Sequence, residues 1–211
     1  MMKVLVIGAN GKTATRVVRI LKASSHEPLA MIRDPSQRDK FDQMTVATVM
    51  ADLEYPIDHA VAGCDAVIFA AGSGGYTGKD KTVLVDHIGA IRSIVAAQVH
   101  GARRFMMLST MNANVYSQSR IAHYHRAKAY ADNYLRGSDL DYTIICPGGL
   151  TEDAGAGMVT VSDQLDGQGK TSRDNLAAAL VKCLEMGNTL RQSFSLLAGQ
   201  TPLDQALGGV C

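Results

Sequence analysis

A tyrosine and a lysine four residues apart, Tyr124 and Lys128, are the side chains of this chain best suited to acid–base chemistry. Residues at i and i+4 lie on one face of a helix, so the phenol and the ammonium project in the same direction. A phenol with a pKa of about 10 is a poor acid–base catalyst at neutral pH unless a nearby cation stabilises the phenolate. Ser109 follows a strand predicted at Arg104–Leu108 and could donate to a substrate carbonyl oxygen. We predict Ser109, Tyr124 and Lys128 as a catalytic trio, although Tyr-x-x-x-Lys also arises by chance on amphipathic helices.

The turn Gly8-x-x-Gly11-x-x-Ala14 has the composition of a phosphate-binding loop. It follows Val4–Ile7, an apolar run typical of a strand buried on both faces of a parallel sheet, and helical periodicity begins at Ala14. Gly8 permits a tight exit from the strand, Gly11 lets backbone N–H groups approach a pyrophosphate, and the helix N-terminus favours the anion. The turn therefore predicts a dinucleotide site with contacts from Gly8, Asn10, Gly11, Lys12 and Thr13.

The same turn has two other interpretations. A P-loop would need a glycine five residues before Gly11, where the chain has Val6. A purely structural glycine-rich turn is the plainer alternative. The position between a strand and a helix favours cofactor binding, and Lys128 is then placed to contact a nicotinamide ribose.

The end of the second predicted strand, Glu27–Ile32, indicates which cofactor is bound. An NAD site usually presents an acidic residue here to the ribose 2′-hydroxyl, whereas an arginine accommodates a 2′-phosphate. Arg33 comes first after the strand, and Lys12 lies in the glycine-rich turn. Asp34 could reach the ribose if the register shifted by one residue, but Asp34-Pro35 is typical of a helix cap. We predict NADP(H) in preference to NAD(H), with Arg33 at the phosphate.

Strands and helices alternate along the whole chain. The run Ala66–Ala71 is entirely apolar and therefore central, and it opens toward the carboxyl edge of the sheet, where Ala71 and Gly72 are expected to contact the cofactor. Helices are predicted at 82–100 and 124–136 and from Ser172 to Met186, with strands at 45–50, 142–146 and 193–197. This alternation predicts an α/β protein with one domain, 1–211: a doubly wound, mostly parallel sheet (a Rossmann fold) with helices on both faces. The Gly- and Asp-rich segment 150–170 is predicted to form a small C-terminal cap on the substrate side.

Composition agrees with one globular domain. Hydrophobic residues make up 46% and charged residues 19% of 211 residues, which are ordinary values for an α/β protein. A formal charge of +1 gives no electrostatic footprint for nucleic acid or an anionic membrane. No apolar run approaches the length of a membrane span, and the N-terminus enters its first strand at once. We therefore expect a cytoplasmic protein without a signal peptide.

The cysteines and histidines give only a weak signal for a metal. Cys64, Cys146, Cys183 and Cys211 lack paired or metal-like spacing, so free thiols are expected. Cys146 keeps a nucleophilic role as a minor alternative. His123 and His125 flank Tyr124, but helical geometry turns their rings about 200° apart. We predict no metal site and leave open that these histidines line a pocket.

Together these motifs resemble the short-chain dehydrogenase/reductase superfamily, in its atypical NAD(P)H-binding branch of flavin- or biliverdin-reductase-like and sugar-epimerase-like proteins. The resemblance runs nearly end to end, through Gly8-Ala-Asn-Gly11, Arg33-Asp-Pro35, Ala51-Asp-Leu53, Ser109-Thr-Met111, Tyr124–Lys128, Cys146-Pro-Gly148 and Ser172-Arg-Asp174. It implies that Asp52 and Leu53 lie beside the adenine and that Pro147 and Gly148 line the nicotinamide side. Asp52 could equally cap the next short helix.

The resemblance has two departures. Cys146 stands where many relatives have arginine, and the asparagine of the superfamily's proton relay has no evident equivalent near Asp86-His87. Some members of the branch also lack the tyrosine or leave it idle.

The combined prediction is an enzyme: an NADP(H)-dependent reductase that transfers hydride to a small carbonyl, quinone or flavin-like acceptor, with the proton from Tyr124. Two alternatives remain, an NADP-binding redox sensor without turnover and a nucleotide-sugar epimerase-like enzyme. The expected partner is a small-molecule substrate, with no nucleic acid or membrane, and the chain is expected to be a monomer or weak homodimer.

Overall fold

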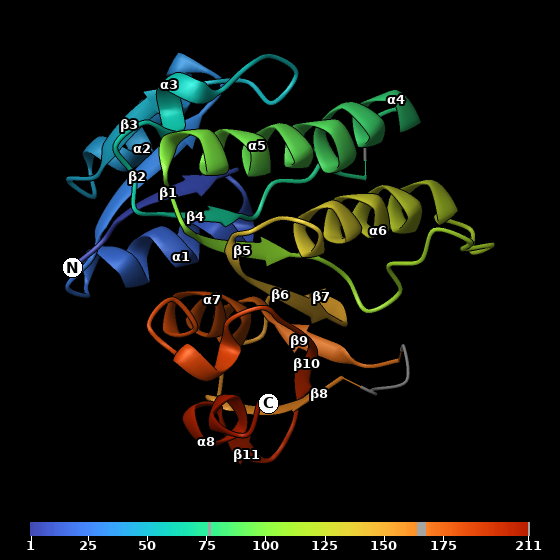
Figure 1. Cartoon of the computed structure of the whole chain (residues 1–211). Coiled ribbons are helices and arrows are strands. Elements are labelled where there is room, and N and C mark those ends of the chain that lie inside the picture. Colours follow the sequence, from blue (N-terminus) through green and yellow to red (C-terminus); the bar gives the residue numbers. More distant parts are fainter. Residues whose placement is uncertain (76, 164–167, 211) are drawn as a thin grey trace.

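A computed structural model of the chain describes residues 1–75, 77–163 and 168–210 (Figure 1). Within them, nine strands form one sheet in the order β11-β8-β10-β6-β5-β4-β1-β2-β3. All neighbouring pairs from β3 to β10 are parallel, whereas β8 pairs antiparallel with both β10 and β11. The predicted doubly wound, mostly parallel α/β fold is confirmed.

The strands of this sheet are β1 (Lys3–Ile7), β2 (Glu27–Ile32), β3 (Ala47–Met50), β4 (Ala66–Phe69), β5 (Arg104–Leu108), β6 (Asp141–Pro147), β8 (Met158–Ser162), β10 (Gln192–Ala198) and β11 (Thr201–Pro202). A separate pair of parallel strands consists of β7 (Gly149–Thr151) and β9 (Lys170–Ser172). The α-helices are α1 (Lys12–Lys22), α2 (Arg38–Asp42), α3 (Asp58–Val61), α4 (Lys79–Lys81), α5 (Ala90–His100), α6 (Ala122–Arg136), α7 (Arg173–Lys182) and α8 (Leu203–Gly208). Short 3₁₀ turns are η1 (Pro35–Gln37) and η3 (Gly187–Thr189), and a π-helical segment, η2 (Thr82–Gly89), joins α4 to α5.

Each face of the sheet has its own hydrophobic core. Val4 and Val6 of β1 belong to the core that includes α1 and α7, while Leu5 and Ile7 belong to the core that includes α5. Successive side chains of a strand point to opposite faces, so an uninterrupted apolar strand is buried on both. Figure 1 shows α1 and α7 on one side of the sheet and α5 and α6 on the other. The carboxyl edge of this two-sided sheet carries the site.

The helical stretch Lys79–His100 corrects two expectations. It is one continuous run of helix, but its middle is π-helical rather than α-helical. By length and composition alone this helix could also cross a membrane, contrary to the expectation that no apolar run is long enough. Asp86, His87 and Arg92 interrupt its apolar residues, so the sequence shows no continuous run. Half of its most apolar window is buried inside the protein, where α5 packs against α3 and α6.

The segment 150–170, predicted as a cap, is divided between two sheets. Its strand β8 joins the edge of the main sheet, while β7 and β9 form the small sheet beside it. Gly148 makes this close packing possible, because a Cβ there would lie 2.5 Å from the carbonyl oxygen of Gly169. Residues 164–167 of the segment lie outside the described chain. Whether the segment covers a substrate stays a prediction.

Two smaller expectations concern the helix after Ser172 and the cysteines. Ser172 is the N-cap of α7, with its hydroxyl accepting from the N–H of Asp174 at 3.2 Å, but the helix ends at Lys182 instead of Met186. The described cysteines are free thiols, as expected: Cys64, Cys146 and Cys183. Cys211 lies outside the described residues.

Candidate cofactor and catalytic site

The glycine-rich turn between β1 and α1 leaves the start of the helix open. Gly8 has a φ of +79°, and a Cβ there would lie 2.6 Å from the Cα of Ala71, so both backbone conformation and space require glycine. Gly11 is the N-cap of α1, with no side chain capping the helix and no acidic residue in its first turn. The first N–H groups of α1 and its positive dipole end are therefore free for an anion. This arrangement fits the pyrophosphate of a dinucleotide.

A cavity of about 260 Å³ adjoins this turn at the carboxyl edge of the sheet. Its walls come from the ends of β1, β2, β3 and β4 and from η2: Gly8, Asn10, Gly11, Met31, Arg33, Gln37, Ala51, Asp52, Leu53, Ala70, Ala71, Gly72, Ser73 and Val85. Most of the predicted cofactor contacts are thus brought together. Five others are not among the wall residues: Lys12, Thr13, Lys128, Pro147 and Gly148.

Arg33 and Asp34 differ in what their side chains do. Arg33 lines the cavity and is exposed, and its guanidinium makes no hydrogen bond or ion pair with the described residues. Asp34 caps η1 by accepting from the backbone N–H and the hydroxyl of Ser36, at 2.8 and 2.7 Å. These bonds hold the pKa of Asp34 below its ordinary value. The cap interpretation of Asp34 is confirmed, and Arg33 is the residue of the two that faces the cavity.

For Asp52 two roles are expected, a contact with the adenine and the cap of the next short helix. Asp52 lines the cavity beside Leu53. Its carboxylate accepts from the N–H of Glu54 at 3.0 Å, which closes a turn. The following helix, α3, has Ile57 at its N-cap, so the expectation that Asp52 caps that helix is wrong. The oxygen Oδ2 has no such bond within the described chain, and the contact of Asp52 with an adenine stays a prediction.

The predicted trio lies beyond β4, on β5 and α6. Ser109 follows β5 and is 3% exposed, and its hydroxyl donates to the carboxylate of Asp132 on α6. Lys128 is 1% exposed, with its ammonium 4.0 Å from the sulfur of Met107 and 5.5 Å from the centre of the Phe69 ring. Tyr124 lies on the same helix, one turn before Lys128. The structure therefore links Ser109 to α6 through an aspartate.

Sequence reasoning missed Asp132, although the signal was present. Tyr124, Lys128 and Asp132 are spaced i, i+4 and i+8, so one face of α6 carries all three. Helical spacing does not identify the partner of Asp132, because Ser109 lies 23 residues away on another element.

The model of a family described as NAD(P)H-binding matches residues 8–186. The chain belongs to this family. A Bacillus subtilis protein described as the uncharacterized sugar epimerase YhfK is 41% identical over 212 residues, covering 98% of this chain and 99% of that protein. The Saccharomyces cerevisiae UPF0659 protein YMR090W is 33% identical, covering 97% of this chain and 96% of that protein. A solved structure from Bacillus halodurans, described provisionally as an NAD-dependent epimerase/dehydratase, is 39% identical with a TM-score of 0.93, covering 99% of each chain.

These comparisons confirm the resemblance to small NAD(P)H-binding proteins that the motifs predicted. The description of the family names a nicotinamide cofactor as its ligand. The glycine-rich turn and the cavity are the features of this NAD(P)H-binding protein that suit such a cofactor.

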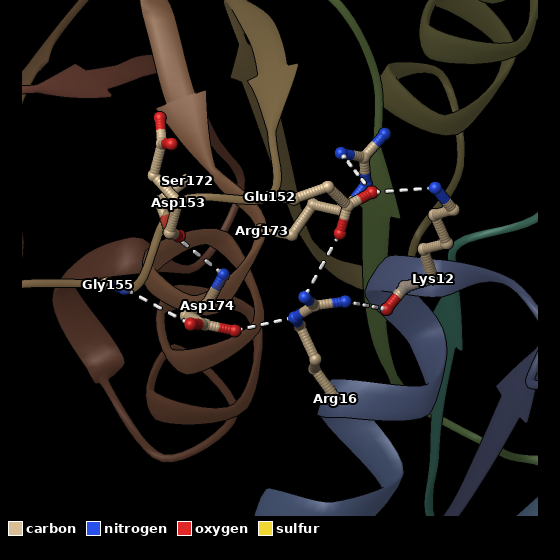
Figure 2. Close-up of polar contacts among 8 residues, drawn as sticks. All are labelled: Lys12, Arg16, Glu152, Asp153, Gly155, Ser172, Arg173 and Asp174. Atoms are coloured by element: carbon tan, nitrogen blue, oxygen red, sulfur yellow. Dashed lines mark hydrogen bonds and ion pairs between the residues drawn. The ribbon is translucent and has the colours of Figure 1, made fainter.

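Lys12 is paired with a carboxylate from the C-terminal part of the chain. Its ammonium pairs with Glu152 at 2.9 Å, and Glu152 also pairs with Arg16 at 3.2 Å and Arg173 at 3.1 Å. Arg16 reaches Asp174 as well, at 2.5 Å. Figure 2 shows Glu152 lying among these three cations, which come from α1 and α7. The network ties α1 to the C-terminal segment. Local spacing does not point to Glu152, because it is 140 residues from Lys12 in the sequence.

Lys40 of α2 is a second residue that sequence reasoning missed. Its ammonium donates to the carbonyl oxygen of Asn10 at 3.3 Å, the side-chain oxygen of Asn10 at 3.0 Å and the hydroxyl of Thr15 at 2.7 Å. Partial burial lowers the pKa of Lys40. The three bonds fix the conformation of the glycine-rich turn, a role that no local spacing reveals.

Burial dominates the electrostatics around Tyr124. It raises the pKa of Tyr124, and the charges of Asp86 and Asp132 raise it further, opposite to the effect expected from Lys128. Burial also raises the pKa of Asp132, opposed by Lys128 and by the bond from Ser109. Burial raises the pKa of the Cys146 thiol to about 12, which argues against a nucleophilic thiolate at neutral pH. Tyr124 is thus a protonated phenol at neutral pH, and in these surroundings it is a weaker acid than a free phenol.

His125, which follows Tyr124 in the chain, contacts two serine hydroxyls. The Nδ1 atom of His125 lies 2.9 Å from the hydroxyl of Ser119 and 3.2 Å from that of Ser117, so this ring anchors the loop that leads into α6. Burial lowers the pKa of His125, which keeps the ring neutral at neutral pH. Residues 1–75, 77–163 and 168–210 contain no group of three or more His, Cys, Asp or Glu side chains arranged to hold a metal ion.

Proposed function

We propose that this protein is an NADP(H)-dependent reductase that transfers hydride to a small carbonyl, quinone or flavin-like acceptor, a reductase of the short-chain dehydrogenase/reductase type. The observation that carries the proposal is the pairing of an anion-ready helix start and cavity with a buried group of proton-carrying side chains on the neighbouring strand and helix. Hydride transfer needs a bound dinucleotide and, for a carbonyl acceptor, one proton in addition.

The preference for NADP(H) rests on Arg33. Its guanidinium lines the cavity without a hydrogen-bonding partner in the described chain, while the neighbouring carboxylate of Asp34 is occupied by Ser36. An arginine in this position suits a 2′-phosphate, and a carboxylate turned away from the cavity does not suit the ribose hydroxyl of NAD.

The proposed chemistry assigns tasks to Tyr124, Lys128 and Ser109. A bound reduced nicotinamide supplies the hydride, that is, two electrons and one proton. The phenol of Tyr124 supplies the second proton to the acceptor oxygen, and the ammonium of Lys128 offsets the negative charge left on the phenolate. Ser109 donates to the same acceptor oxygen after its hydroxyl turns away from Asp132. The phenolate is reprotonated from solvent before the next turnover.

The substrate side of the proposed site is formed by Pro147, Gly148 and the segment 150–170. Support comes from position: Pro147 ends β6, and its carbonyl oxygen accepts from the N–H of Met111, just after Ser109, at 3.2 Å. Gly148 then leads into β7 at the carboxyl edge of the sheet.

The test measures NADPH oxidation with one carbonyl, one quinone and one free flavin, for the unmodified protein and two variants. Tyr124→Phe keeps the ring but removes the acid, so carbonyl reduction should fall by at least ~10²-fold. Lys128→Met should cause a similar loss and also weaken cofactor binding. Flavin reduction should persist in Tyr124→Phe, because solvent can protonate a reduced flavin. Undiminished carbonyl reduction by Tyr124→Phe would refute the assigned role of the phenol.

A sugar epimerase is the second candidate, because the 41%-identical Bacillus subtilis relative is described by that activity. An epimerase returns the hydride to its substrate, so it would invert a nucleotide sugar without net consumption of cofactor. Nucleotide-sugar inversion, followed by NMR with catalytic amounts of cofactor, distinguishes the two. Cofactor binding with neither activity would favour the redox sensor.

A further inference from the structure

Asp86 is a buried carboxylate to which the proposed reaction assigns no task. It lies in η2 and is 1% exposed. One oxygen, Oδ2, accepts from the backbone N–H of Ser73 at 3.0 Å, while the other, Oδ1, is buried without a hydrogen-bond partner in the described residues. No ion pair to Asp86 occurs in the described chain either. A buried carboxylate left in this condition is costly, so its retention calls for a ligand.

The unpartnered oxygen lies directly behind the wall of the cavity, since Asp86 itself is not a wall residue but its neighbours are. Gly72 and Ser73 are both wall residues, and a Cβ placed on Gly72 would be 3.2 Å from Oδ1 of Asp86. Val85, next to Asp86 in the chain, is also part of the wall. Because position 72 is glycine, no side chain at this wall position stands next to Oδ1.

The other side of Asp86 faces the catalytic helix. η2 packs against α6, and the ring of His87 stacks on that of Tyr130 at 5.1 Å. The charge of Asp86 contributes to the raised pKa of Tyr124, which is consistent with this packing. Asp86 thus stands between the β4 end of the cavity and the face of α6 that carries Tyr124.

This location corresponds to one half of a dinucleotide. In doubly wound folds the two mononucleotide halves lie across the carboxyl edge, with the pyrophosphate at the first helix. Arg33 and Asp52, from the ends of β2 and β3, are on the adenine side of that helix. The sheet order places β4 on the opposite side of β1, toward β5 and Ser109. The residues after β4, together with Asp86, therefore adjoin the nicotinamide half.

We propose that Asp86 is a ligand of the nicotinamide half and that its charge makes the site bind the oxidised cofactor more tightly than it would without that charge. An oxidised nicotinamide ring carries a positive charge that the reduced ring lacks, and a carboxylate in a low-dielectric wall acts strongly on such a charge. By linkage, tighter binding of the oxidised form makes the bound reduced form a stronger hydride donor. The inference rests on the cofactor site of the proposed function and is independent of which acceptor is reduced.

The experiment measures equilibrium dissociation constants for NADP⁺, NADPH and adenosine 2′,5′-bisphosphate by calorimetry. Asp86→Asn keeps an oxygen for the N–H of Ser73 but removes the charge. We expect NADP⁺ to weaken by about tenfold more than NADPH, the size of one charge-assisted contact. Adenosine 2′,5′-bisphosphate, which has no nicotinamide half, should bind unchanged. Asp80→Asn is the matched control, since this exposed carboxylate lies in α4 of the same helical stretch and should leave all three constants unchanged.

Several outcomes would overturn the inference. Equal weakening of NADP⁺ and NADPH would show that Asp86 does not sense the ring charge, and equal weakening of all three ligands would show a structural role. If Asp86→Asn does not fold, Gly72→Ala tests the same placement, because its methyl group would separate the ligand from Oδ1. NADP⁺ should then weaken more than NADPH, and an unchanged ratio would refute the placement. None of these measurements requires turnover, so a failed reductase assay leaves them decisive.

Discussion

The two halves of the proposed site carry charges in opposite surroundings. On the side of α1 and β2, Lys12 and Glu152 pair while 71% and 51% exposed, and Arg33 is exposed at the cavity. On the side of α6, Lys128 and Asp132 are each 1% exposed. Water and salt screen the first group, so each of its contacts is individually weak. In the second group burial decides which side chain holds a proton, and an unmatched charge is costly.

The halves meet where Gly8 touches Ala71, and this contact should be the most sensitive to substitution. Gly8→Ala forces a side chain into a positive φ and against the backbone of Ala71. We expect the free energy of unfolding to fall by roughly 3–4 kcal/mol. Gly63→Ala is the matched control, because Gly63 has a φ of +75° but nothing within 4 Å of its Cβ position. It should lose only about 1–2 kcal/mol in urea denaturation. Equal losses would mean that the contact with Ala71 contributes nothing.

On the exposed side, Arg33 should carry the discrimination between cofactors. A charge-assisted contact with the 2′-phosphate contributes roughly 1.5–3 kcal/mol, about ten- to a hundredfold in affinity. Arg33→Ala should therefore remove most of the preference for NADPH over NADH, measured as a ratio of dissociation constants. Arg38→Ala is the control, since Arg38 is exposed nearby but is not part of the cavity wall. Equal affinity of the unmodified protein for both cofactors would contradict the assignment.

The pH dependence of stability should have opposite signs for one carboxyl group in each half. The folded pKa of Asp132 lies above its ordinary value of 3.8, so folding favours the protonated form and stability is lost as the pH rises above that value. Asp132→Asn should therefore gain stability relative to the unmodified protein as the pH rises. The folded pKa of Asp34 lies below 3.8, so its contribution is present above that pH and is lost as the pH falls.

Asp34→Asn should accordingly be less stable than the unmodified protein at neutral pH, with the difference vanishing in acid. Urea denaturation of both variants between about pH 3 and pH 8 checks the signs. Differences of the same sign for the two variants would break the contrast between the buried and the exposed half.

The smallest effect is expected at Glu152. Glu152→Gln removes the exposed anion among Lys12, Arg16 and Arg173, so NADPH should bind slightly more tightly at low salt, by about twofold. The gain should disappear near 1 M salt, because the screening length is then only about 3 Å. Asp139→Asn is the control: this exposed carboxylate lies near the start of β6, at the edge of the sheet away from the cavity. A gain that persists at high salt would contradict a screened interaction.

Local sequence was sufficient for most of the fold and for the glycine-rich turn between β1 and α1. The predicted strands Glu27–Ile32 and Arg104–Leu108 have the observed boundaries, and Gly101 ends α5 with a φ of +75°. The cap at Asp34 was also predicted. These features follow from preferences that act within a few residues: the period of apolar side chains, the conformational freedom of glycine and short side-chain to backbone bonds.

Only the tertiary structure decided which charges meet. The bond from Ser109 to Asp132, the ion pair of Lys12 with Glu152 and the bonds from Lys40 to Asn10 join residues from different elements. The unpartnered oxygen of Asp86 depends likewise on how η2 packs against the end of β4. Burial shifts the pKa of Asp132 upward and that of Lys40 downward, and burial depends on the surroundings that packing creates. Sequence spacing describes one helix or strand at a time, and therefore it does not predict contacts between side chains of different elements.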